Sequence, residues 1–171
     1  MGERERGAGM IDRFADWFAG VLLEKGVITE DELEVQVYGI QTSRGIFCGP
    51  EYYAIRSIRN ERYAYIMNLT PEATFKCMST NPKKGWWMSW KEKAATDEFV
   101  RRQVERYQKR PAEELYDIVN DPFQTRNLAD DPQYAGEKAR MRAKLLQWME
   151  SQGDKGQQTE MEALEHMVKH R

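Results

Sequence analysis

The amino-acid sequence predicts an α+β fold: a small antiparallel sheet of about four strands covered by a C-terminal helix, with a helical appendage at the N-terminus. Three observations support this prediction. Two neighbouring segments rich in β-forming residues are joined by a short turn, which is typical of an antiparallel hairpin. Shorter strand-like segments lie before and after this pair. A long amphipathic helical pattern then follows at residues 132–152.

The appendage is expected to occupy residues 1–34, and the α+β domain residues 35–171. Within the appendage, Ile11–Lys25 places apolar side chains at the spacing of one helical face, and a glycine follows directly. A second short helix is expected to begin at Thr29, because Thr29 and Glu32 have the spacing of a capping box. The appendage is therefore predicted to be helical throughout, apart from its charged, glycine-containing start.

The strands of the domain are predicted from runs of β-branched and aromatic residues. The first is expected at Val37–Ile40. Tyr53–Arg59 and Arg62–Leu69 are predicted to pair as a hairpin around a turn at Asn60-Glu61. Glu114–Val119 is expected to add one more strand to the same sheet.

Two longer helices are predicted. Lys91–Arg110 is expected to form one helix, while residues 71–90 are expected to be irregular because prolines and a glycine interrupt them. The second helix spans 132–152, since Asp131 is a good N-cap and a proline occupies the first helical position. A last helix is expected at about 160–169. The buried stripe of the 132–152 helix is predicted to consist of Tyr134, Met141, Leu145, Trp148 and Met149.

Composition and charge exclude several classes of protein. The chain has 171 residues, with 26 Lys and Arg against 28 Asp and Glu and a formal net charge of −2, so a basic nucleic-acid binder is not expected. No apolar run approaches the roughly 20 residues of a membrane span, and Phe14–Leu23 lacks a signal-peptide cleavage site. The two cysteines form neither a metal motif nor a disulfide framework. We expect no nucleic-acid or membrane partner, and the compartment is not identified.

Two segments resemble a known family. Arg56–Asn68 is similar to a hairpin near the C-terminus of sulfatases that has the pattern R-x-x-R-x-x-R-Y-K-x-I. Glu114–Ala129, with the sequence ELYDIVNDPFQTRNLA, resembles the family's E-L-Y-D-L-x-x-D-P-x-E-T-x-N-L-A segment. The resemblance covers residues 35–167 in the family's order. Gly153-Asp154 also fits the branch of heparan N-sulfatases, also called N-sulfoglucosamine sulfohydrolases.

The resemblance implies a family function without supplying its chemistry. Sulfatases use a formylglycine, made from Cys or Ser in a C/S-x-P-x-R motif, together with a calcium ion held by Asp and Asn side chains. These groups belong to a large N-terminal domain that this chain is expected to lack. The resemblance therefore implies a non-catalytic C-terminal subdomain with no catalytic residue, metal site or cofactor of its own. Its expected partners are a sulfatase catalytic domain and sulfated carbohydrate, and the family is often exported.

Gln41 and Arg44 are the candidate substrate contacts, because their loop matches a region that borders the substrate cleft in sulfatases. Two other clusters leave alternatives open. Arg56, Arg59 and Arg62 either bind an anion or, as we favour, lie on a solvated sheet face and pair with carboxylates. Trp86, Trp87 and Trp90 either stack on a sugar or, as we favour, cover the sheet.

Three patterns resemble chemical sites but depart from them. Cys48-Gly-Pro-Glu-Tyr52 begins like the formylglycine motif, yet its fifth residue is Tyr52 instead of Arg. His166 and His170 have the spacing of helical metal ligands, but a metalloprotease motif needs Glu directly after the first histidine. Asp130-Asp131 is better explained by helix capping than by calcium binding, which needs 6–8 oxygens. None of the three is expected to be a functional site.

Three interpretations remain open at this point. The chain is a sulfatase subdomain, a stand-alone module that binds sulfated carbohydrate, or a truncated gene product with no independent role. If it is an isolated subdomain, we expect it to expose apolar surface, and Val37–Ile46 and Trp86–Trp90 are the candidate segments.

Overall fold

The computed structural model describes residues 21, 24–26, 34–42, 53–76, 80, 85–163 and 165. The chain divides into two compact units, Met1–Gln36 and Val37–Arg171. Most of the predicted Ile11–Lys25 helix lies outside the described residues. Its last turn is described: the Lys25 amide donates to the Val21 carbonyl at 3.1 Å, and Gly26 follows with a left-handed φ of 65°. No helix in the described part of the chain is long and apolar enough to cross a membrane.

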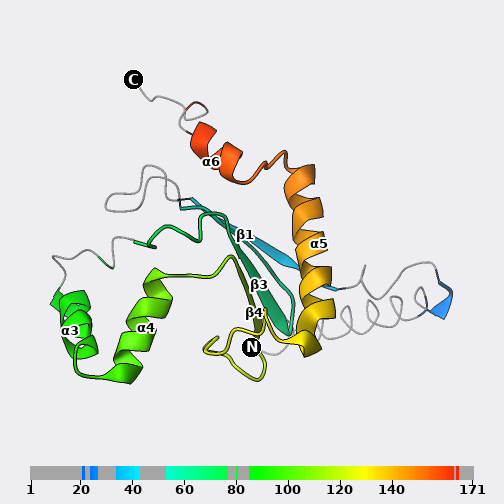
Figure 1. Ribbon diagram of the computed structural model, residues 1–171. Coiled ribbons are helices and arrows are strands. Elements are labelled where there is room, and N and C mark those ends of the chain that lie inside the picture. Colours follow the sequence, from blue (N-terminus) through cyan, green and yellow to red (C-terminus); the bar gives the residue numbers. More distant parts are fainter. Residues whose placement is uncertain are drawn as a thin grey trace, which may run out of the picture. The chain divides into compact units, whose positions relative to one another are not determined.

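The second unit is built on a four-stranded sheet in which neighbours along the chain are neighbours in space (Figure 1). All three pairings are antiparallel, as the sequence predicts. The register places Ile58 between Tyr38 and Tyr65, and Tyr65 beside Leu115, so these four side chains share one face. The strands are β1 (Val37–Gln41), β2 (Ile55–Arg59), β3 (Tyr63–Asn68) and β4 (Glu113–Asp117).

The predicted hairpin is confirmed, and Asn60 shapes its turn. The Asn60 amide donates to the Tyr63 carbonyl at 3.0 Å. Its side-chain oxygen accepts from the amides of Arg62 and Tyr63 at 2.9 and 2.5 Å. A single asparagine therefore satisfies the backbone groups that the turn leaves unpaired, which is why the short β2–β3 connection is well defined.

The predicted C-terminal helix is also confirmed, with a tighter first turn. Asp131 accepts from the Gln133 amide at 3.0 Å and caps a 3₁₀ turn, η2 (Pro132–Tyr134), which leads into α5 (Ala135–Ser151). Gly153 follows the helix and its cap residue with a φ of 68°, a conformation that favours glycine. The Asp154 amide then donates to the Met149 carbonyl at 2.8 Å, closing the end of the helix. The following helix, α6 (Gln157–Glu162), begins before the predicted residue 160.

The main core lies between α5 and one face of the sheet (Figure 1). Met141, Leu145 and Met149 of α5 pack against the strand residues Ile58, Tyr65 and Leu115, and all six side chains are buried. The predicted stripe is complete, because Tyr134 and Trp148 are partly buried against the same cluster. Trp148 stacks on Tyr38 with ring centroids 4.7 Å apart, which joins the edge strand β1 to the helix.

Leu145 and Leu146 give a direct test of this packing. Leu145 is 0% exposed and Leu146 is 38% exposed. Leu145→Ala is expected to lower the free energy of unfolding by about 2–5 kcal/mol, because it leaves a cavity between helix and sheet. Leu146→Ala is expected to cost less than about 1 kcal/mol, since most surface substitutions have small effects. Urea denaturation of both variants measures the difference, and equal losses would contradict this placement of α5.

The prediction of one helix over Lys91–Arg110 is wrong. The structure has two helices, α3 (Gly85–Ala94) and α4 (Glu98–Gln108), which contact each other (Figure 1). Asp97 breaks the pattern because its side chain accepts from the Val100 amide at 3.2 Å and caps α4. Residues 85–90 are helical instead of irregular. Trp87 is buried there and lies 5.6 Å from the Tyr107 ring, so tertiary packing outweighs the modest helix propensity of tryptophan.

Candidate functional site

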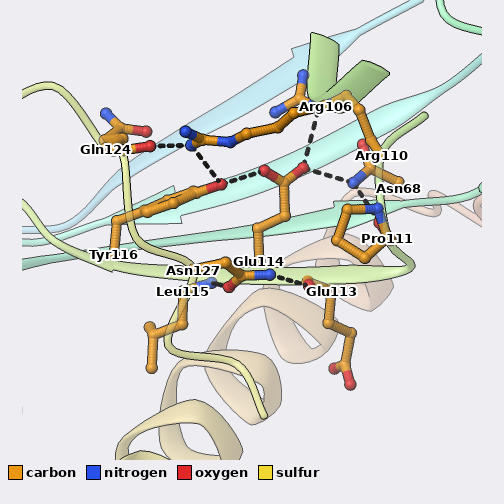
Figure 2. A network of polar contacts seen from close by, with 10 residues as sticks. All are labelled: Asn68, Arg106, Arg110, Pro111, Glu113, Glu114, Leu115, Tyr116, Gln124 and Asn127. Atoms are coloured by element: carbon orange, nitrogen blue, oxygen red, sulfur yellow. Dashed lines mark hydrogen bonds and ion pairs between the residues drawn. The ribbon is translucent and has the colours of Figure 1, made fainter. Parts of the chain in front are cut away.

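A network of polar side chains is centred on Glu114, on the face of the sheet opposite α5 (Figure 2). Glu114 is only 4% exposed. Its carboxylate accepts hydrogen bonds from Arg110 Nε at 2.9 Å, Asn68 Nδ2 at 2.7 Å and Tyr116 Oη at 2.5 Å. Glu114 and Tyr116 alternate along β4, and Arg110 follows α4, so the network joins three separate parts of the chain.

Arg106 extends the network to the turn after β4. Its Nη1 donates to the Thr125 carbonyl at 2.9 Å, and its Nη2 donates to the Gln124 carbonyl and to Tyr116 Oη at 3.3 Å. Gln124 has a φ of 53°, which non-glycine residues rarely adopt. The guanidinium of Arg106 on α4 therefore binds both β4 and the strained turn at Gln124.

Electrostatics fix the protonation states of this network. Burial alone would raise the pKa of Glu114, but hydrogen bonds from Arg110, Tyr116 and Asn68 outweigh it and lower the pKa below its usual range. Burial and the hydrogen bond to Glu114 raise the pKa of Tyr116 to about 12. At neutral pH the site therefore holds an ionised carboxylate and a neutral phenol. A carboxylate with three donors is a poor base, so the network is suited to positioning and binding.

The loop after β4 is held by hydrogen bonds from its own side chains. Asn127 accepts from the amides of Leu115 and Ala129 at 2.9 and 3.0 Å, and its side-chain nitrogen donates to the Glu113 carbonyl at 3.2 Å. Asp117 accepts from the amides of Val119 and Asn120, both at 3.2 Å. These residues fold the loop and leave Phe123 exposed at its tip.

Two open cavities adjoin the network. One, of about 330 Å³, lies between α4 and the 121–124 turn; the other, of about 360 Å³, lies on the sheet face. Arg110 and Gln124 line both, so the two are neighbours around these residues. The first is also lined by Arg106, Tyr107, Glu114, Tyr116 and Phe123, and the second by Gly39, Ser57, Arg59, Ala64 and Ile66.

A buried ion pair lies on the opposite face of the sheet. Arg56 is 2% exposed, and its Nε and Nη2 bind the two carboxylate oxygens of Asp154 at 2.5 and 3.3 Å. Its Nη1 donates to the Ile55 carbonyl at 3.1 Å. Burial alone would raise the pKa of Asp154, but hydrogen bonds from Arg56 and the Gly156 amide lower it overall. The segment after α5 is therefore fastened to β2.

The three arginines of the hairpin have different surroundings, which partly corrects their interpretation as a solvated row. Arg56 is buried, because the segment after α5 covers it and supplies Asp154. Arg62 is exposed and pairs with Asp117 at 3.0 Å, as the favoured interpretation requires. Arg59 is exposed and lines the sheet-face cavity on the opposite face of the sheet, which is called the groove below.

The tryptophan cluster also differs from its favoured interpretation. Only Trp87 is buried; Trp86 and Trp90 are 49% and 50% exposed. The cluster lies on α3 and packs on α4 through Tyr107, so it does not cover the sheet.

Of the two candidate substrate contacts, the structure describes Gln41. Gln41 ends β1 with an exposed side chain, and its carbonyl accepts from Arg56 Nη1 at 3.5 Å. Arg44 lies outside the described residues, so the role of both as substrate contacts stays a prediction. Sequence reasoning missed the Glu114 network. Its signal was the spacing of Arg106 and Arg110, four residues apart, ahead of the alternating Glu114 and Tyr116.

Among the described residues, no group of three His, Cys, Asp or Glu side chains could hold a metal ion. Asp131 caps η2 and pairs with Arg126 at 3.3 Å, which accounts for its carboxylate. The Cys48–Tyr52 segment and the His166–His170 pair lie outside the described part of the chain. No catalytic step through calcium or formylglycine is derived from these residues.

Comparison with known proteins identifies relatives by sequence. No family model matches the chain. An ulvan-active sulfatase from Formosa agariphila is 32% identical over 124 residues, which are 72% of this chain. Over most of its length the chain is similar in sequence to part of a sulfatase. A second ulvan-active sulfatase from the same organism is 28% identical over an alignment of 123 residues that covers 64% of the chain.

The sulfatase relationship concerns a short part of each relative. The chain spans 22% and 19% of the lengths of these two sulfatases. Two solved structures, a putative sulfatase from Bacteroides thetaiotaomicron and a 2-O GAG sulfatase, each match 70% of this chain and 17% of their own. Both have 23% identity and a TM-score of 0.39, at which a superposition supports no conclusion.

Proposed function

We propose that the chain is the C-terminal subdomain of a sulfatase and acts only when joined to a catalytic domain that supplies formylglycine and calcium. The observation that carries this proposal is the 32% identity to a sulfatase of which the chain spans only 22%. The two sequence motifs, the hairpin and the ELYD strand, also favour a sulfatase subdomain. Within the family, Gly153-Asp154 favours the heparan N-sulfatase branch, so the proposed substrate class is a sulfated carbohydrate.

Exposed apolar side chains support the need for a catalytic partner. Val37 and Ile40 of β1 are 63% and 56% exposed, and Trp86 and Trp90 of α3 are about half exposed. These residues lie in the segments where the sequence predicts uncovered apolar surface. Clusters of exposed apolar side chains commonly mark an interaction surface or an aggregation liability. A catalytic domain that covers them would remove this liability.

Activity assays on the purified chain test the proposal. We expect no turnover of an aryl sulfate or of N-sulfoglucosamine above the buffer rate, because the nucleophile and the calcium ligands come from another domain. A sulfatase catalytic domain that lacks its own C-terminal segment should bind the chain and regain turnover. Cys48→Ala is the control: turnover by the chain alone that disappears in this variant would contradict the proposal.

The alternative function is a stand-alone module that binds sulfated carbohydrate, and the groove beside Arg59 and Arg110 favours it. Binding of heparan fragments by the chain alone, with no binding to a catalytic domain, would support this alternative. If the chain shows neither carbohydrate binding nor binding to a catalytic domain, it is a truncated product with no independent role.

A further inference from the structure

Arg110 has hydrogen-bonding capacity that the described residues do not use. A guanidinium carries five N–H donors, and Arg110 uses its Nε–H to bind Glu114 at 2.9 Å. No residue in the described part of the chain accepts a hydrogen bond from its Nη1 or Nη2. The side chain is only 23% exposed, so it is partly withdrawn from water. The guanidinium group also lies over an aromatic ring, because its central carbon is 5.9 Å from the centre of the Phe75 ring.

The unused nitrogens belong to a residue that lines two adjoining cavities. Nη1 and Nη2 form a planar pair of donors, the geometry that binds two oxygens of a sulfate or carboxylate. Because Nε is occupied by Glu114, the end of the guanidinium is the edge left for a ligand. Glu114 is ionised and fixed by three donors, so it positions the arginine and does not compete for the remaining edge.

A second guanidinium lies along the same groove. Arg59 is exposed, lines the sheet-face cavity with Arg110, and makes no ion pair or hydrogen bond with any described residue. In the register, Arg59 of β2 lies opposite Ala64 of β3, which lies opposite Tyr116 of β4. Arg59 is therefore level with Tyr116, and it is separated from Glu114 by two strands, roughly 10 Å across the sheet, and by two residues, roughly 7 Å along the strand direction. The floor between them is low because Gly39, Ser57 and Ala64 are small.

The position of the groove favours a ligand recognised through side chains. It lies on a sheet face, where the backbone groups are already paired within the ladder, so an extended peptide cannot add a strand there. What the groove offers is guanidinium N–H groups, the Ser57 hydroxyl and, at its far end, the exposed rings of Tyr107 and Phe123. This chemistry matches an oxyanion, either free or carried on a small ring.

We propose that the Nη1–Nη2 edge of Arg110 is an oxyanion-binding site for a sulfate group, with Arg59 as a second, weaker contact along the groove. Binding at this site requires only residues of this chain, so it can be measured without a catalytic domain. If the proposed sulfatase function proves wrong, the proposed binding site still stands, because the experiment measures sulfate binding to the chain alone.

The test is an NMR titration of the full chain, following the arginine side-chain N–H signals. Sodium sulfate replaces sodium chloride at constant ionic strength, and a monosulfated hexose is titrated in a second series. We expect a saturable shift of the Arg110 signals with sulfate. Tighter binding of the hexose sulfate would show that the ring is recognised as well, and equal affinity would indicate a site for the free anion.

Three conservative variants, one of them a control, separate the effect of the paired guanidinium donors from the effect of charge. Arg110→Lys keeps a cation for Glu114 but loses the paired donors, so sulfate affinity should fall by about tenfold or more. Arg102→Lys is the matched control: Arg102 lies on α4, is 60% exposed and pairs with Glu98, so affinity should stay unchanged. Arg59→Lys should weaken binding less than Arg110→Lys does.

Three outcomes would overturn the proposal. The Arg110 signals of the unmodified chain stay unshifted, the shift grows linearly with salt as it does for chloride, or Arg110→Lys binds sulfate as tightly as the parent. The titration of the unmodified chain decides the question even if Arg110→Lys does not fold.

Discussion

Arg56→Met is expected to lower the free energy of unfolding by about 3–5 kcal/mol, because it leaves the Asp154 carboxylate buried without its partner. In the structure, Arg56 and Asp154 are 2% and 6% exposed and share two hydrogen bonds. Methionine fills much of the arginine stem, so the loss reports the charge more than the packing. Chemical denaturation followed by tryptophan fluorescence measures it.

Arg62→Met is the matched control for this pair. Arg62 comes from the same hairpin and binds Asp117 at 3.0 Å, but it is 57% exposed. Exposed ion pairs contribute little, so the Arg62 variant should be far less destabilised than the Arg56 variant. The double variant Arg56→Met with Asp154→Leu should recover part of the loss, since it removes both charges. Equal effects at Arg56 and Arg62 would show that Arg56 is hydrated in solution.

The same pair predicts a pH dependence. The folded-state pKa of Asp154 is lowered from its ordinary value, whose unfolded reference is about 4. The stabilising contribution of its ionised form is therefore fully present above about pH 5 and is lost as the pH falls below about 4 towards the folded-state value. Asp154→Asn should be less stable than the parent at pH 7, with a difference that shrinks as the solution becomes acidic.

Glu114→Ala is the second substitution with a large expected effect, about 3–5 kcal/mol of unfolding free energy. It removes the acceptor for Arg110, Asn68 and Tyr116 at once and leaves their donors unpaired in a buried site. Glu114→Gln keeps one acceptor oxygen and the side-chain volume, so its loss should be clearly smaller. Thermal unfolding of both variants beside the parent makes the comparison. A loss below about 1 kcal/mol for the alanine variant would contradict the network.

The strands and the C-terminal helix could be predicted because their signals are local. The turn at Asn60, the cap at Asp131 and the stripe through Met141 and Leu145 each depend on residues close in sequence. The break between α3 and α4 was missed, since an aspartate cap inside a helical pattern resembles an ordinary polar position. The burial of Trp87 depends on Tyr107, which lies twenty residues away, and local pattern does not report such contacts.

The candidate site was harder to predict than the fold. Arg56 alternates with apolar residues as a surface residue does, and its burial follows only from Asp154, 98 positions later. Glu114 begins one of the two segments that resemble sulfatases, but its partner Asn68 ends the other segment, 46 positions earlier, and Arg110 lies in neither. Long-range polar pairing of this kind leaves no periodic trace in a single sequence.

The link between Arg56 and Asp154 also determines where the folded unit can be shortened. A truncation after Ser151, at the last residue of α5, would keep every strand and the whole main core. It would nevertheless remove Asp154 and leave a guanidinium without a counter-ion inside the protein. It would also remove Glu160, which accepts a hydrogen bond from the Thr42 hydroxyl just beyond β1. A fragment that keeps both of these contacts must therefore extend through Glu160, well past the end of the helix.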